Sequence, residues 1–349
     1  MPSLEIKPYL PWLAPLAGYS NAPFRLLCRH MGAYATCTEM VSAKGIYYSL
    51  HPNGCSSFRL PGPGNINMQK GKGSWALLAS PEEESPLIIQ LFGAEPDIVA
   101  IAAESILQLF AGREIYFDLN MGCSVPKVVK TGSGAVMLAD PVNALKVAEA
   151  LIAAAGAGKV GFKLRLGWLN GENIYLKLGK QLEDAGAAWI TLHPRYGKQA
   201  FTGKADWSKI AALKQELSIP VLASGDLLSA AAAKSCLEQT GADAVMFARG
   251  AMNNPFIFRE FSRLMQGENA ARPTLAELMD AISQHASLAW KWLDERYALS
   301  QMRGFIPRYV HHFAGVRALR QQLTTCRNRE QLDAIISQFI ASQTADPGE

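Results

Sequence analysis

No run of about 18 or more apolar residues, the length that a membrane-spanning helix needs, occurs in the 349-residue chain. The amino terminus, Met1 to Glu5, lacks the basic start and long apolar stretch of a signal peptide. These two absences predict a soluble cytoplasmic protein. Its 49% of hydrophobic residues suffices for a packed core.

Cysteine is scarce as well. The six cysteines lie at positions 28, 37, 55, 123, 236 and 326, and no two are spaced Cys-x-x-Cys. A chain of this length needs no disulfide framework, and this spacing predicts no zinc or other metal site. Most of these thiols are expected to be small buried hydrophobic groups.

The fingerprint of dinucleotide-binding sheets, Gly-x-Gly-x-x-Gly after the first strand, is also missing. The first strand-like run ends with Ala14 to Gly18, which does not fit it, and Thr131 to Gly134 lacks the third glycine. An open doubly wound sheet is therefore only the second choice of fold.

Short apolar runs of strand type recur eight times in the first 250 residues, and helix-like segments separate most of them. This alternation favours parallel β/α units, and eight of them match a TIM (β/α)8 barrel, an α/β fold. The predicted strands are Trp12–Gly18, Thr36–Ala43, Pro86–Gly93, Glu114–Gly122, Lys159–Gly167, Trp189–Arg195, Ile219–Gly225 and Ala244–Gly250. The predicted helices include Pro96–Ala111, Pro141–Ala155, Ile174–Ala185, Trp207–Glu216 and Ala230–Gln239.

Beyond Pro255 only helical patterns remain, at Leu275–Tyr297, Pro307–Leu323 and Arg329–Ser342. We therefore expect a barrel domain at residues 1–255 and an all-helical domain at residues 256–349. The segment Phe58–Pro86 is rich in Gly, Pro, Ser and charged residues, and it is predicted to be a long loop that becomes ordered on binding.

Polar side chains stand at the carboxyl ends of nearly all the predicted strands, where TIM barrels build their active sites. They are Glu39, Gln90, Asn120, Cys123, Lys163, Arg165, His193, Arg195, Ser224 to Asp226 and Arg249. Solvation of strand ends accounts for some of them. It accounts less well for Lys163, because a lysine within an apolar strand is unfavourable unless it meets an anion or lines a polar cavity.

The last two strands lead into the turns Ser224-Gly225-Asp226 and Ala248-Arg249-Gly250. TIM barrels commonly bind phosphate in these loops, since glycine lets backbone N–H groups approach an anion and arginine can bind two of its oxygens. Together with Lys163, the turns predict a phosphorylated cofactor across the barrel mouth.

Several motifs resemble bacterial tRNA-dihydrouridine synthases and keep the order of that family from about residue 12 to residue 340. The most specific are Asn120-x-Gly122-Cys123 and Lys163-x-Arg165-x-Gly167-Trp168. The others are Ala14–Gly18 with Pro23–Arg25, Leu192–Arg195, Phe201–Trp207, Thr240–Met246, Arg249–Ala251 and Asn254–Phe258. The resemblance implies an FMN-binding barrel with a C-terminal helical domain. Such an enzyme reduces uridines in the tRNA D-loop to 5,6-dihydrouridine, with NADPH as the reductant.

The resemblance also assigns roles. Cys123 takes the position of the catalytic acid that protonates C5 of uracil, and a thiol with a pKa of about 8.5 is protonated at neutral pH. FMN contacts are expected at Pro15, Leu16, Ala17, Gln90, Lys163, His193, Ser224, Gly225, Asp226, Ala248 and Arg249. Substrate contacts are expected at Asn120, Arg165, Arg195 and Lys127. The family commonly has Met, Pro, Asn and Gly where this chain has Leu16, Ser124, Ser224 and Ala248.

The modest net charge of +4 hides one local block. From Arg296 to Arg329 the chain holds seven arginines and no Asp or Glu. This block predicts a surface that follows tRNA phosphates, and the target base would leave its stack to enter the pocket. Barrel lysines could extend that surface, namely Lys70, Lys72, Lys127, Lys130, Lys198 and Lys204. A monomer is expected from the resemblance.

Two other functions stay open at this point. An FMN-dependent barrel dehydrogenase that acts on a free small molecule, such as a dihydropyrimidine, explains the barrel but leaves the arginine-rich block without a role. A non-catalytic tRNA-binding module that kept the barrel would lack flavin colour after purification.

Overall fold

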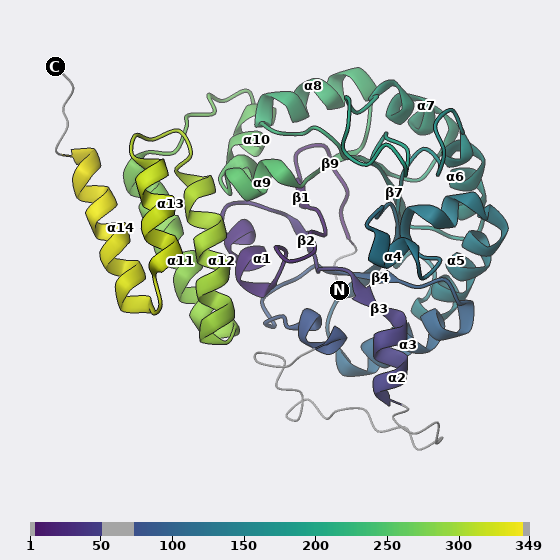
Figure 1. Cartoon of the computed structure of the whole chain (residues 1–349). Helices are drawn as coiled ribbons and strands as arrows, with labels where there is room; N and C mark the ends of the chain where they lie inside the picture. Colours follow the sequence, from purple (N-terminus) through teal and green to yellow (C-terminus); the bar gives the residue numbers. More distant parts are fainter. Residues whose placement is uncertain (1–3, 51–72, 345–349) are drawn as a thin grey trace.

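The computed structural model describes residues 4–50 and 73–344 of the chain. Short parallel strands form one closed sheet, and helices surround it (Figure 1). Pairing of β1 with β9 and of β2 with β4 closes the sheet, so the predicted TIM (β/α)8 barrel is confirmed. The strands are β1 (Trp12–Leu13), β2 (Ala35–Cys37), β3 (Val41–Ser42), β4 (Leu87–Phe92), β5 (Ile115–Met121), β6 (Val160–Leu164), β7 (Trp189–Leu192), β8 (Val221–Ala223) and β9 (Ala244–Phe247).

These strands occupy eight barrel positions, because β2 and β3 are two parts of the single strand predicted over Thr36–Ala43. Both pair with β4, β2 at Ile88 and β3 at Leu91. Between them, the hydroxyl of Thr38 accepts a hydrogen bond from the N–H of Gln90 at 3.1 Å. A side chain thus takes the place of a backbone partner, which a pattern of apolar residues cannot reveal.

Some of the helices between the strands begin at prolines or capping residues. At the start of α5 (Pro141–Ala155), the side chain of Asp140 accepts the N–H of Asn143 at 3.1 Å, and Pro141 suits the first turn. α8 (Ala230–Thr240) is followed by Gly241, whose φ of 66° is left-handed. The other helices before residue 270 are α1 (Ala22–His30), α2 (Ala43–Leu50), α3 (Pro96–Leu109), α4 (Pro126–Val129), α6 (Ile174–Asp184), α7 (Ser208–Glu216), α9 (Arg249–Asn253) and α10 (Ile257–Met265).

Alternate residues of each strand point into the barrel, where an apolar lower layer supports a polar upper layer. In the lower layer, the rings of Trp12 and Trp189 meet edge to face at 5.3 Å between centroids. Gly161 makes room for Trp189, since a Cβ at position 161 would lie 1.9 Å from the indole ring. Polar residues follow two positions further along the strands, such as Asp118 in β5 and Lys163 in β6. The polar layer of the barrel interior therefore packs on the apolar layer below it.

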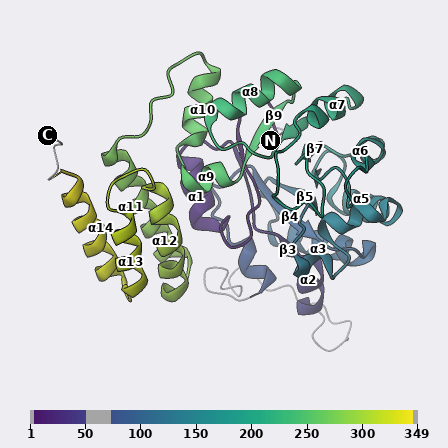
Figure 2. The ribbon, with the colours of Figure 1, turned by 45° about the horizontal axis from the view of Figure 1, so that its top comes forward.

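Four helices follow the barrel and lie at its flank beside α1 and α10 (Figure 1, Figure 2). They are α11 (Leu275–Trp292), α12 (Glu295–Tyr309), α13 (Val316–Thr325) and α14 (Arg329–Thr344). Phe24 of α1 stacks against Phe305 of α12, with ring centroids 4.7 Å apart. The helical character predicted for this region is confirmed, and the division at residues 255 and 256 remains a prediction.

Two helix boundaries predicted in this region are wrong. The helix predicted over Leu275–Tyr297 stops before Asp294, whose carboxylate caps α12 by accepting the N–H of Tyr297 at 3.0 Å. The helix predicted over Pro307–Leu323 begins only after Gly315, which has a left-handed φ of 76°. Pro307 instead lies in the last turn of α12, where its ring removes a single intrahelical hydrogen bond.

The loop predicted over Phe58–Pro86 lies partly outside the described residues. Its described part, from residue 73 onward, contains the 3₁₀ turn η1 (Ser74–Leu78), so this part is not wholly irregular as predicted. Within residues 4–50 and 73–344, no helix combines the length and the apolar character needed to cross a membrane. In the same ranges, no three His, Cys, Asp or Glu side chains are grouped so that they could hold a metal ion.

Candidate active site

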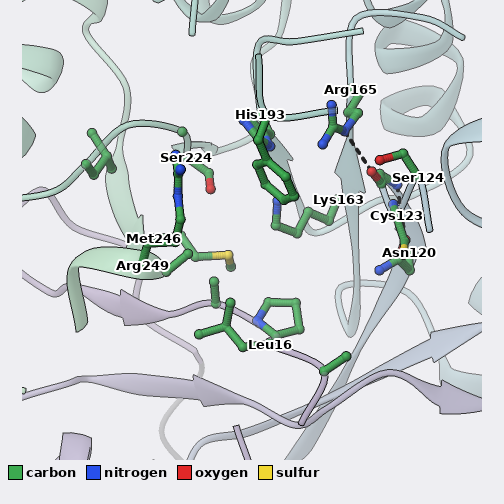
Figure 3. A pocket seen from close by; sticks show the side chains of 18 of the residues that line it. Leu16, Asn120, Cys123, Ser124, Lys163, Arg165, His193, Ser224, Met246 and Arg249 are labelled. Carbon is green, nitrogen blue, oxygen red and sulfur yellow. Dashed lines mark hydrogen bonds between the residues drawn. The ribbon is translucent and has the colours of Figure 1, made fainter. Parts of the chain in front are cut away.

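A cavity opens at the carboxyl ends of the barrel strands (Figure 3). In that view, Asn120, Cys123 and Ser124 form one wall, Met246 and Arg249 form the opposite one, and Lys163 reaches into the space between them. Most of the predicted site residues line the cavity: Pro15, Leu16, Ala17, Asn120, Cys123, Lys163, Arg165, His193, Ser224, Gly225, Asp226, Ala248 and Arg249. The fold therefore brings together side chains from six barrel strands and the loops that follow them.

Cys123 lies two residues beyond the end of β5, on a loop that hydrogen bonds hold at several points. Oδ1 of Asn120 accepts the N–H groups of Gly122 at 3.1 Å and of Cys123 at 2.9 Å. The carbonyl oxygen of Cys123 accepts the N–H of Ala135 at 2.8 Å. Gly134 permits this close packing, since a Cβ there would lie 2.5 Å from the same oxygen. Cys123 is partly exposed on the cavity wall, where a ligand can reach its thiol.

Lys163 is the cation at the centre of the cavity. Its ammonium makes no hydrogen bond or ion pair with any residue in the described part of the chain. Burial lowers the pKa of Lys163 to about 8, although the nearby carboxyl of Asp118 opposes this shift. Asp118 itself is fully buried, and burial raises its pKa to about 7 against the opposing effects of Gln90 and Lys163. Lys163 is thus available to an acceptor on a ligand.

His193 presents a neutral imidazole to the cavity. The guanidinium of Arg195 lies 3.0 Å from Nε2 and can only donate, so Nε2 accepts and Nδ1 carries the ring proton. Burial, and then the charges of Lys163 and Arg165, lower the pKa of His193 far below its ordinary value. Gly225 allows the next loop to approach the ring, since a Cβ there would lie 2.7 Å from Cδ2. The Nδ1–H group remains as a donor for a ligand.

Asp226 is the acidic residue of the cavity lining, and two arginines already match its charge. Arg195 donates to Oδ1 at 3.0 Å and to Oδ2 at 2.8 Å, and Arg249 donates to Oδ1 at 2.8 Å. Burial alone would raise the pKa of Asp226, but these guanidinium groups hold it below its usual value. Because Lys163 and Arg165 also line the cavity, its net charge is positive, which suits an anionic ligand.

Two buried arginines hold the loop that follows β7. Arg165 donates to the carbonyl oxygens of Tyr196 and Ala200, both at 2.7 Å. Arg195 donates to the carbonyl oxygen of Gly203 at 2.6 Å. Much of the hydrogen-bonding capacity of both side chains is used within the protein, and the substrate contacts expected of them remain predictions.

This loop places Phe201 at the cavity mouth, a position that the sequence motif alone did not reveal. Phe201 is 60% exposed, and its ring lies 5.6 Å from the guanidinium of Arg165 and 5.3 Å from that of Arg249. Met40, Leu227, Leu228 and Met246 also line the cavity without having been predicted. The alternation of inward residues along β9 could have indicated Met246, whereas the loop residues carry no comparable pattern.

Three predicted site residues do not line the cavity. Gln90 is buried beneath it, where it donates to Asp118 at 2.6 Å and accepts from Asn120 at 2.8 Å. Arg195 is buried behind the lining, and Lys127 is exposed on α4. The contacts expected of these three residues with FMN or substrate remain predictions.

Comparison with known proteins gives consistent matches over most of the chain. The family model "Dihydrouridine synthase (Dus)" matches residues 12–58 and 65–344. The probable tRNA-dihydrouridine synthase 1 of Synechocystis sp. is 35% identical over 331 residues, which cover 94% of this chain and 86% of that protein. The tRNA-dihydrouridine synthase B of Pseudomonas aeruginosa is 30% identical over 95% of this chain and 92% of that protein. Among solved structures, morphinone reductase in complex with tetrahydroNAD shares 13% identity over 77% of this chain, at a TM-score of 0.48, which is too weak a likeness to bear on function.

Proposed function

The chain belongs to the dihydrouridine synthase family, and from this premise we propose that it reduces uridines of tRNA to 5,6-dihydrouridine. The proposal takes the D-loop as the target region, FMN as the cofactor, NADPH as the reductant and Cys123 as the proton donor. It is supported above all by one observation: Lys163, without a protein partner among the described residues, and the Cys123 loop face the same positively charged cavity. We further propose that the protein acts as a monomer in the cytoplasm.

The chemistry of the cavity suits FMN. Leu16 and Met246 offer apolar contact to the ring system, and Lys163 can stabilise negative charge on the reduced ring. Arg249 and the backbone at Gly225 lie where the loops after β8 and β9 meet, the usual phosphate site of TIM barrels. FMN, when bound, supplies the hydride for the reaction.

The protein has to supply the proton. Reduction of the C5=C6 bond of uracil adds a hydride at C6 and a proton at C5; the Cys123 thiol gives that proton and is later reprotonated from solvent. The side-chain oxygen of Asn120 accepts hydrogen bonds from the backbone N–H groups of Gly122 and Cys123. One of its two amide hydrogens is donated to Gln90. Its second amide hydrogen is therefore what Asn120 can offer to a uracil oxygen.

The arginine-rich block supplies the surface for tRNA. Arg303, Arg308 and Arg320 line one groove between α12 and α13. Arg308 also lies 5.6 Å from the ring of Tyr19, two residues beyond Ala17 of the cavity lining, so this surface adjoins the segment that supplies part of that lining. Phosphate contacts would orient the tRNA, while the cavity accepts the unstacked uracil.

Dihydrouridine mapping of tRNA tests the function directly. Cells that lack this protein should lose dihydrouridine at defined D-loop positions, and the wild-type gene should restore it. In vitro, undermodified tRNA should reoxidise the NADPH-reduced enzyme much faster than free uridine does. Equal rates with free uridine would favour a small-molecule dehydrogenase, and a purified protein without flavin absorbance would favour a non-catalytic module.

A further inference from the structure

Beneath the Cys123 loop lies a chain of three polar side chains that leads into the barrel interior. Gln90 of β4 stands opposite Asp118 of β5 and donates from Nε2 to its Oδ2 at 2.6 Å. Nδ2 of Asn120 donates to Oε1 of Gln90 at 2.8 Å. Oδ1 of Asn120 then accepts the backbone N–H groups of Gly122 and Cys123. Asp118 and Gln90 are completely buried and Asn120 nearly so, which leaves them to satisfy one another.

The last link of this chain determines its direction. A backbone N–H group can only donate, so the atom of Asn120 that faces the Cys123 loop must be its oxygen. Nδ2 of Asn120 then has to donate to Gln90, and Nε2 of Gln90 has to donate to residue 118. Position 118 therefore needs an acceptor, which a carboxylate or an amide provides and an aliphatic side chain does not.

The presence of an aspartate at position 118 is not explained by a contribution to the stability of the fold. Its second oxygen, Oδ1, is buried without a hydrogen-bond partner among the described residues. An unsatisfied buried polar atom of this kind destabilises a fold by about 1–3 kcal/mol, more if charged. The structure thus holds an unfavourable group at a place from which a hydrogen-bonded chain reaches the loop of Cys123.

We propose that Asp118 is a positioning residue that acts through Gln90 and Asn120 to hold the Cys123 loop for proton transfer. This inference rests on the proposed reduction of tRNA uridine. A displacement of about 1 Å between reacting groups can slow a reaction by about 100-fold. Because the chain ends at the Cys123 loop, its loss should slow the step with tRNA and spare the reduction of the cofactor by NADPH.

Two substitutions separate the effect of the hydrogen bond between Gln90 and Asp118 from the effect of the Asp118 charge. Asp118→Asn keeps an oxygen that accepts from Gln90, whereas Asp118→Leu keeps the branched shape, at a larger volume, without an acceptor. In rapid-mixing experiments on the FMN-loaded full chain, Asp118→Leu should slow reoxidation by undermodified tRNA by about 10- to 100-fold and change reduction by NADPH by less than about two-fold. Asp118→Asn should keep both rates within about three-fold of wild type.

A second readout does not depend on turnover. The amide hydrogens of Gly122 and Cys123 should exchange with solvent about 10-fold faster in Asp118→Leu than in wild type or Asp118→Asn. Thr191→Val is the matched control, because it removes a buried hydroxyl without a partner on β7 and leaves the chain intact. It should change neither the rates nor the amide exchange. If Asp118→Leu does not fold, Gln90→Met cuts the same chain at its middle link, and amide exchange at Gly122 and Cys123 is then the readout, because Gln90 is also an expected FMN contact.

The outcomes distinguish this inference from the function on which it rests. A wild-type enzyme that cannot reduce tRNA would overturn the proposed function, and amide exchange would still decide whether Asp118 holds the loop. With an active wild type, unchanged reoxidation or unchanged exchange in Asp118→Leu would overturn the positioning role. Equal losses in Asp118→Asn and Asp118→Leu would also overturn it, because they would assign the effect to the charge.

Discussion

Gln301 of α12 donates a hydrogen bond from Nε2 to the carbonyl oxygen of Gly18 at 3.1 Å. The same amide accepts a hydrogen bond from Asn21 at 3.1 Å. Gly18 directly follows the cavity residues Pro15, Leu16 and Ala17. The first helix of the arginine-rich block is therefore bonded to a wall of the cavity, although 283 positions separate the two residues.

Gln301→Leu should weaken FMN binding by about 3- to 10-fold. Two hydrogen bonds, each contributing about 1 kcal/mol, would no longer order the loop before FMN binds. Titration of the apoprotein with FMN, followed by flavin fluorescence, measures the affinity. Gln343→Leu is the matched control, because it removes a glutamine–carbonyl bond to Ala314 at the far end of the helical region. Equal FMN affinities in wild type, Gln301→Leu and Gln343→Leu would show that the loop keeps its shape without α12.

Cys123→Ala should bind FMN as wild type does and be reduced normally by NADPH, while reoxidation by tRNA should slow by at least about 100-fold. The reason is that a positioned proton donor contributes about 10²- to 10⁴-fold to such a step. Cys236→Ala is the cysteine control, since that thiol is buried in α8. If Cys123→Ala turns over tRNA near the wild-type rate, the proton donor lies elsewhere.

Lys163→Met should lower the midpoint potential of bound FMN by about 30–60 mV. The Lys163 ammonium stabilises the added negative charge of the reduced flavin, and about 30 mV corresponds to 1.4 kcal/mol for a two-electron couple. Spectroelectrochemical titration measures the potential. Lys177→Met, on the exposed face of α6, is the control and should leave it unchanged. A potential in Lys163→Met within a few millivolts of wild type would contradict the assigned contact.

The barrel and most residues that line the candidate site could be predicted because both follow from local patterns. Polar residues such as Asn120, Lys163 and His193 interrupt apolar runs near their ends, and parallel strands bring those ends to one face. The sequence could not show which cations meet a ligand. Arg165 and Lys163 lie two positions apart in the same motif, yet loop carbonyls accept hydrogen bonds from Arg165, whereas Lys163 has no partner within residues 4–50 and 73–344. Those carbonyls come from a separate loop that only the tertiary fold places there.

The helix start predicted at Pro307 is wrong for a similar reason. Proline usually begins or interrupts a helix, so Pro307 predicted a start. In the structure Pro307 is buried in α12, close to Phe305, which stacks on Phe24 of α1. Packing against the barrel helix therefore outweighs the local signal of the proline.

Simultaneous reversal of Arg317→Glu, Arg320→Glu and Arg327→Glu should weaken tRNA binding by at least about 10-fold. It should also reduce the slope of log affinity against log salt by about one for each tRNA phosphate that the arginines no longer neutralise. All three side chains are exposed, so the fold should persist. Binding at several salt concentrations measures both quantities.

The control for this surface reverses three exposed lysines, Lys146→Glu in α5, Lys159→Glu just before β6 and Lys177→Glu in α6. It changes the net charge by the same amount. In Figure 1, α5 and α6 lie across the barrel from α13. If both triple variants lose affinity equally, overall charge and not the arginine-rich block governs binding to tRNA.

A buried ion pair should set the acid stability of the barrel. Arg25 of α1 donates to both carboxylate oxygens of Glu84, at 2.6 and 3.0 Å. Burial alone would raise the pKa of Glu84, but Arg25 holds it below its usual value. A lowered pKa in the folded state stabilises the protein above the ordinary value of about 4.3, and this stabilisation disappears as the pH falls through the folded pKa.

Arg25→Met should therefore lower the free energy of unfolding by about 3–5 kcal/mol at pH 7, because it leaves a buried carboxylate without its partner. This decrease in the free energy of unfolding should be smaller at pH 4. Burial raises the pKa of Glu84 in the variant, so at pH 4 its side chain is neutral and no unpaired charge is buried. Urea unfolding at both pH values measures it. The double variant Arg25→Met/Glu84→Leu should recover much of the loss at pH 7, because it removes the unpaired charge. An equal loss at the two pH values, without recovery in the double variant, would show that Arg25 stabilises the barrel by packing and not by its charge.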